Sequence, residues 1–144
     1  MRIDYMKWNR NIRKEADLKI DCDTHRANPI KRFNFRLRYL MQYFPYMSPC
    51  KIIVYRTKKG FHFYVYWNVY FYVYWNTSIG NDTEKVLFQA LLGSDWLREL
   101  RNYNRINKGD TNWNLLFSVK EKNGKTKTER FYCSYVLKAG SSHR

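Results

Sequence analysis

The chain has 144 residues, enough for one domain, and its 27 Lys and Arg residues outnumber 12 Asp and Glu residues, which gives a formal charge of +15. It contains no run of about 20 apolar residues that could cross a membrane as a helix, and no apolar signal segment follows its basic start, so we expect no membrane partner. Three scattered cysteines, Cys22, Cys50 and Cys133, match no zinc or disulfide pattern and predict free thiols in a reducing compartment such as the cytoplasm. Because like charges oppose compact folding, the excess of cations predicts an anionic partner, DNA or RNA.

The first half of the chain predicts two strands and a helix. Residues 1–15 predict a basic arm, ahead of a single domain of residues 16–138 and a frayed tail of residues 139–144. Residues 18–22 alternate as in a strand, and the β-branched residues 51–56 predict a second strand after a helix that ends at Pro45. The apolar face of that helix has the spacing i, i+4, i+7, i+8, i+11, at Phe33, Leu37, Leu40, Met41 and Phe44.

An internal repeat marks the next segment, because Phe-Tyr-Val-Tyr-Trp-Asn of residues 63–68 recurs as residues 71–76. The offset of eight preserves the alternation of a strand, with Phe, Val and Trp on one face and His62 and tyrosines on the other. A strand of residues 61–76 would span about 50 Å, which is unusually long. We therefore expect a bulge or bend near Asn68, or a strand that projects beyond the sheet. The aromatic repeat of residues 61–76 is equally a candidate edge for self-association, since a long apolar strand invites pairing.

The second half predicts two helices and a hairpin. A capping box at Asn81 and Glu84 starts the first helix, and the second is expected to pack Trp96, Leu100 and Tyr103 inward. Residues 113–119 and 131–137 predict strands around an Asn-Gly turn at residues 123–124. The order indicates an α+β fold of the ferredoxin-like or RRM-like βαββαβ type, with an antiparallel sheet, helices on one face and an extra C-terminal β-hairpin.

Cations cluster along this expected fold and form candidate phosphate contacts. Tyr64 and Tyr66, on the expected open face of the sheet, are candidates for stacking on bases. The candidate phosphate-binding residues are Arg36, Arg38, Arg56, Lys58, Lys59, Arg98, Arg101, Arg105, Lys122, Lys125, Lys127 and Arg130.

Residues 59–66, Lys-Gly-Phe-His-Phe-Tyr-Val-Tyr, resemble the signature of RNA-recognition motifs, which runs basic, Gly, aromatic, small, Phe, Val, any, aromatic. His62 and Tyr64 depart from that signature. A plain RNA-recognition motif would expose Phe61 and Phe63, whereas the composition favours His62 and the tyrosines on the open face, because tyrosine tolerates water better.

Asp21 and Asp23 lie two apart on the first strand, so they point to one face, where carboxylates can bind a divalent cation. Together with Gly60-Phe61-His62 on a later strand, they resemble the core of the archaeo-eukaryotic primase and primase–polymerase superfamily over roughly residues 18–66. The resemblance implies that Asp21 and Asp23 bind catalytic Mg²⁺ or Mn²⁺ and that His62 contacts nucleotide phosphates. The third acidic motif of that family is not found in the sequence.

Three hypotheses for function follow. The first is a basic nucleic-acid-binding protein without catalytic activity. The second is a minimal or degenerate primase-like nucleotidyltransferase or nuclease that uses Asp21, Asp23 and His62. The third is a structural subunit of a viral or ribonucleoprotein assembly, whose basic arm and hairpin contact nucleic acid.

Overall fold

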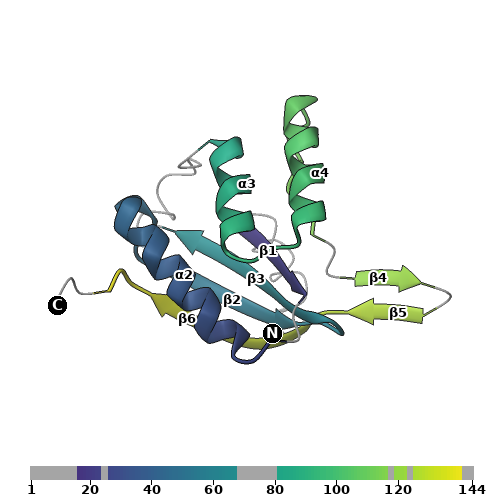
Figure 1. Ribbon diagram of the computed structural model, residues 1–144. Helices are drawn as coiled ribbons and strands as arrows, with labels where there is room; N and C mark the ends of the chain where they lie inside the picture. The colour runs from purple at the N-terminus through teal and green to yellow at the C-terminus, as the bar shows by residue number, and fades with distance from the viewer. Residues whose placement is uncertain (1–15, 24–25, 68–80, 117–118, 123–124, 141–144) are drawn as a thin grey trace, which may run out of the picture.

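In the part of the chain that the structure describes, the protein has an antiparallel sheet of four strands in the order β1-β3-β2-β6, three α-helices and a separate two-stranded sheet (Figure 1). The computed structural model describes residues 16–23, 26–67, 81–116, 119–122 and 125–140, and of residues 119–122 and 125–127 it describes only the backbone. The elements in chain order are β1 (Leu18–Asp23), α2 (Pro29–Tyr43), the 3-10 helix η1 (Pro45–Met47), β2 (Cys50–Arg56), β3 (Gly60–Trp67), α3 (Asp82–Leu91), α4 (Trp96–Asn107), β4 (Val119–Lys122), β5 (Lys125–Thr128) and β6 (Arg130–Leu137).

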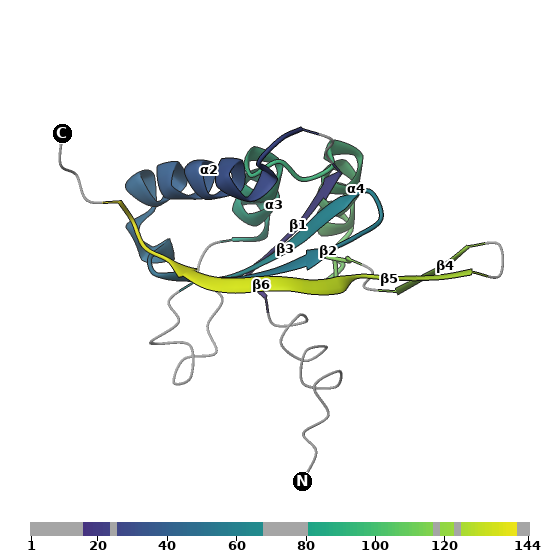
Figure 2. The ribbon, with the colours of Figure 1, turned by 90° about the horizontal axis from the view of Figure 1, so that it is seen from below.

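Helix α2 lies across one face of the sheet and buries the apolar stripe that the sequence predicts (Figure 2). Its Phe33 ring stacks on Phe63 of β3, with 4.0 Å between the ring centroids. Leu37 and Met41 lie in the same core cluster, to which α3 adds Phe88. Burial of this stripe on the sheet is the main apolar contact of the fold, and it confirms the helical periodicity.

Helices α3 and α4 close the outer edge of β1 instead. The backbone N–H of Lys19 donates to Gln89 of α3, and the N–H of Asp21 donates to Ser94 in the α3–α4 turn. The carbonyl of Lys19 accepts from Arg98 of α4, and the carbonyl of Asp21 accepts from the N–H of Asp95. An unpaired strand edge exposes such groups, so these bonds protect β1 from pairing with another strand.

The C-terminal part of the chain differs from the expected βαββαβ order. Residues 113–116 form no strand, so the strand expected over residues 113–119 is wrong. The predicted turn at residues 123–124 lies outside the described residues. The strands on either side of it, β4 and β5, pair only with each other among the described strands and extend beyond the sheet (Figures 1 and 2). The last strand, β6, pairs with β2, while α3 and α4 occupy the edge of β1.

The packing of α4 is the reverse of the prediction. Arg98, Glu99 and Asn102 are buried, whereas Trp96 and Leu100 are 68% and 57% exposed. The sequence periodicity is correct, but the surface that α4 meets is the polar edge of a strand, which needs hydrogen-bond partners.

The capping box at the start of α3 is confirmed, since the Asn81 side chain accepts from the N–H of Glu84 at 2.8 Å. The second copy of the aromatic repeat, with the expected bend near Asn68, lies outside the described residues, as do the arm of residues 1–15 and the last residues of the tail. Among the helices described, none is long and apolar enough to cross a membrane.

Candidate functional site

Asp21 and His62 face each other across the β1–β3 pair, on the side of the sheet away from α2. His62 Nε2 lies 3.3 Å from Asp21 Oδ1. Gly60 of β3 pairs with Asp23 of β1. Glycine allows the two strands to lie this close, because a Cβ at residue 60 would lie 2.0 Å from the carbonyl oxygen of Cys22. The structure therefore brings together the two motifs that carry the primase-like resemblance.

A third acidic residue, Glu129, completes this cluster. Its Oε2 lies 2.6 Å from His62 Nδ1 and accepts a hydrogen bond from the Tyr64 hydroxyl at 2.9 Å. Burial lowers the pKa of His62, but hydrogen bonds and charges of Asp21 and Glu129 raise it more, so that it lies above the ordinary value. Glu129 directly precedes β6, and no sequence motif surrounds it. Its position beside His62 follows only from the pairing of β6 with β2.

Asp23 shares this cluster. Burial is the largest cause that raises the pKa of Asp23, followed by the charge and hydrogen bond of Asp21, while Lys59 lowers it. Both nitrogens of His62 thus contact carboxylates in an imidazole that is 6% exposed. Although these side chains lie close together, no three His, Cys, Asp or Glu side chains in the described ranges are arranged so that they could hold a metal ion, and the cluster therefore does not fit a catalytic cation.

The expected open tyrosine face is wrong. Tyr64 and Tyr66 are 1% and 8% exposed and pack with Ile53 and Tyr55, against which Leu116 also lies. The parity of the strand is as predicted, with Phe63, Val65 and Trp67 towards α2, but both faces are covered. Neither tyrosine is exposed for stacking on a base in this structure.

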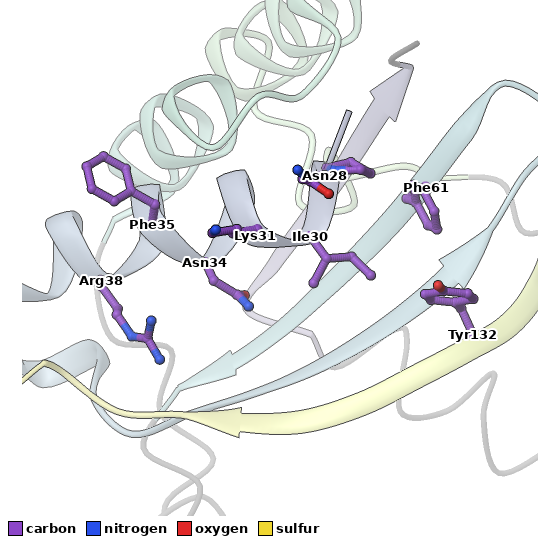
Figure 3. A pocket seen from close by; sticks show the side chains of 9 residues that line it. Asn28, Ile30, Lys31, Asn34, Phe35, Arg38, Phe61 and Tyr132 are labelled. Atoms are coloured by element: carbon purple, nitrogen blue, oxygen red, sulfur yellow. The ribbon is translucent and has the colours of Figure 1, made fainter. Parts of the chain in front are cut away.

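A groove on the other face offers exposed rings and cations instead (Figure 3). It encloses about 620 Å³, within the usual range for ligand sites. Lys31, Asn34 and Arg38 of α2 line one side, and Phe61 of β3 and Tyr132 of β6 line the other, as Figure 3 shows. The Phe61 and Tyr132 rings contact each other, with centroids 5.4 Å apart.

A β-bulge in β6 aims Tyr132 into this groove. The register of β6 against β2 places Cys133 opposite Val54 and Phe131 opposite Tyr55, so that Tyr132 is the extra residue. Phe131 packs against Tyr55 on the far face, whereas Tyr132 contacts Phe61 on the α2 face. The sequence predicts a regular strand over residues 131–137 and misses the bulge, a feature that often re-aims a side chain next to a functional site.

The predicted phosphate contacts fall into three groups. Arg98 is buried and donates to Asn114 and to backbone carbonyls, so its predicted exposure is wrong. Arg36 is exposed and lies against the α3–α4 turn, where a Cβ on Gly93 would be 2.6 Å from its Nη1. Arg38, Arg56, Lys58, Lys59, Arg101 and Arg130 are exposed and Arg105 is half-buried, whereas the side chains of Lys122, Lys125 and Lys127 lie outside the described part of the structure.

No protein-family model matches the chain, and neither a curated protein nor a solved structure shows significant similarity to it. The function is therefore inferred from the residues and geometry of the chain itself.

Proposed function

We propose that the protein binds single-stranded nucleic acid, with bases stacking in the groove between α2 and the sheet and phosphates contacting the cations around it. The observation that carries the proposal is the joint placement of Phe61 and Tyr132 beside Lys31 and Arg38. Aromatic rings next to cations are the usual combination in proteins that bind single strands, because every base has a face on which a ring can stack.

The surrounding charge supports the same proposal. The chain has 27 cationic side chains against 12 acidic ones. Lys31 and Arg38 are exposed on α2, and Arg56 and Arg130 are exposed at the ends of β2 and β6, where these strands pair. A nucleic-acid strand that enters the groove would meet the cations of α2 on one side and the partly exposed rings of Phe61 and Tyr132 on the other. Paired bases in a duplex would not present their faces to Tyr132.

The test is binding of a fluorescent single strand, DNA or RNA, measured by anisotropy at several salt concentrations. Affinity should fall steeply with salt, and Arg38→Ala should reduce the slope of log affinity against log salt by about 0.7. Tyr132→Ala should weaken binding by about 5-fold or more, since loss of one stacked base costs about 1–3 kcal/mol.

Phe131→Ala is the matched control, because it removes the neighbouring ring on the opposite face of β6. It should leave affinity close to that of the wild type once circular dichroism shows a folded protein. Binding that does not depend on salt, or equal losses in Tyr132→Ala and Phe131→Ala, would reject the groove as the binding site.

The primase-like alternative is tested with the same labelled strands. Its support is the contact between Asp21 and His62 that the motif order predicts. Extension or cleavage of the strand that needs added Mg²⁺ or Mn²⁺ and disappears in Asp21→Asn would favour it over binding alone. Unchanged strands after long incubation would leave binding as the function.

A further inference from the structure

The exposed sides of α3 and α4 carry six large apolar side chains. Each of them is between 43% and 68% exposed: Leu87, Leu91, Trp96, Leu97, Leu100 and Tyr103. We call these six residues the apolar face. None of them lines the groove, so the apolar face is a surface separate from the proposed nucleic-acid site.

The spacing of these residues makes one stripe on each helix. Leu87 and Leu91 are four residues apart on α3, and Trp96, Leu100 and Tyr103 follow the pattern i, i+4, i+7 on α4. A short turn at Gly93, with φ of +99°, joins the two helices, which stand side by side (Figure 1). Both stripes therefore belong to the same helical hairpin.

The opposite side of the hairpin is required by the fold. Gln89, Ser94 and Arg98 bond to the backbone of β1, and Gln89 and Ser94 also donate to Glu99. Turning the apolar stripe inward would remove these bonds and leave the polar groups of the β1 edge without partners. Rotation of α4 onto the core is therefore not an alternative way to bury Trp96 and Leu100.

We propose that the apolar face is a dimer interface on which a second copy of the chain packs the same face. With about 200 Å² for a large side chain, the exposed fractions leave roughly 600 Å² of apolar surface. That is at the upper end of what single chains expose, and with its polar rim it approaches the roughly 800 Å² per partner of a stable interface.

Charged side chains lie at one end of the hairpin that carries the apolar face, and their signs suit a copy of the same hairpin. Asp82 and Glu84 lie at the start of α3, and Arg105 and Lys108 lie at the end of α4, with Arg101 one turn earlier. Because the helices of a hairpin run in opposite directions, these acidic and basic ends lie at the same end of the hairpin. A two-fold axis along the hairpin places α3 of one copy against α4 of the other, so acidic residues meet basic ones.

The first test is the mass of the full chain in solution, measured by sedimentation at about 0.15 M salt, where charges screen over about 8 Å. The expected mass is twice the 17.7 kDa of one chain. Leu100→Glu should raise the dimer dissociation constant by about 30-fold, the effect of losing a central contact. Tyr39→Glu, which puts the same charge on the exposed side of α2, should leave the dimer unchanged.

The second test concerns orientation. Glu84→Lys and Arg101→Glu should each weaken the homodimer, because like charges then meet twice across the two-fold axis. An equimolar mixture of the two variants should form a heterodimer as tight as the wild type, since every pair is again opposite in charge. Thermal unfolding of each variant shows whether the fold is retained.

The proposal is overturned if the wild-type chain stays monomeric up to its solubility limit, or if Leu100→Glu and Tyr39→Glu dimerise equally. It is also overturned if the monomeric wild type binds phosphatidylserine vesicles and Leu100→Glu does not, because the apolar face then contacts lipid. Failure of the mixed variants to restore the dimer rejects the two-fold arrangement.

Discussion

Helices α2 and α4 are both amphipathic, but they turn opposite sides to the rest of the protein. Helix α2 buries Phe33 and Leu37 on a sheet face and exposes Arg38. Helix α4 buries Arg98 and Glu99 against a strand edge and exposes Leu100. The difference lies in the surface that each helix meets, since a sheet face offers side chains and an edge offers backbone N–H and C=O groups.

The magnitudes explain why the polar side wins at an edge. Burial of one leucine side chain contributes about 1.5–3 kcal/mol, whereas an unsatisfied buried polar group costs about 1–3 kcal/mol and a charged one more. The α3–α4 hairpin makes four bonds to the β1 backbone at Lys19 and Asp21. Together these bonds outweigh the apolar contacts that α4 leaves exposed.

The largest effect is expected from Arg98, the cation at the centre of the buried polar contact. Arg98→Met should lower the free energy of unfolding by about 3–5 kcal/mol, because Glu99 would remain buried without its ion-pair partner. Urea unfolding followed by circular dichroism measures the loss. Arg101→Met, three residues on and exposed, should change stability by no more than about 0.5 kcal/mol.

Equal losses at both positions would show that α4 does not bury Arg98. If Glu99→Gln restores the free energy of unfolding in the Arg98→Met background, the loss is caused by the Glu99 carboxylate that is left without its ion-pair partner. A double-mutant cycle of these changes measures that coupling directly.

Local pattern predicted most of the fold. The helix around Leu37, the strand pair β2–β3 and the cap at Asn81 each depend on neighbours in the sequence, and all are present. The turn predicted at residues 123–124 lies outside the described residues, although β4 and β5 on either side of it pair with each other. The place of β6 and the inverted packing of α4 depend on which strand edge remains unpaired, which involves residues far apart in the chain. Amphipathic spacing shows that α4 has two different sides but not which side is buried.

The next largest effect concerns the apolar residues of the same two helices. Leu37→Ala in α2, where the side chain is fully buried, should cost about 2–5 kcal/mol, since it removes core contacts and leaves a cavity. Leu100→Ala in α4 should cost no more than about 0.5 kcal/mol in the single chain, measured at low protein concentration. Comparable losses in both variants would mean that Leu100 packs within its own chain.

The residues of the candidate sites likewise include some that the sequence predicted and others that it did not. The primase-like resemblance predicted that Asp21 and His62 share a face, and strand pairing places them directly opposite each other. Tyr132 and Glu129 were missed, since a bulge and a loop end have no periodicity. The prediction of an open face for Tyr64 failed because exposure depends on Leu116 and other residues that cover the sheet from elsewhere in the chain.

The smallest effect is expected from His62, on the face of the sheet opposite α2. Asp21 and Glu129 raise the pKa of His62 above 6.5, so its protonated form stabilises the folded state. That contribution is fully present below about pH 6.5 and is lost as the pH rises through the raised pKa. The free energy of unfolding should therefore fall with pH above 6.5 in the wild type, and this fall should be absent in His62→Gln.

Other groups titrate in different windows. Burial raises the pKa of Asp17 to about 6, so Asp17 changes the free energy of unfolding at lower pH than His62 does. Burial also raises the pKa of Cys22 above 9.0, so Cys22 changes it only at higher pH. Urea unfolding from pH 6.5 towards pH 9 thus isolates the imidazole. Identical slopes in the wild type and His62→Gln would mean that the carboxylates of Asp21 and Glu129 do not stabilise a charged His62.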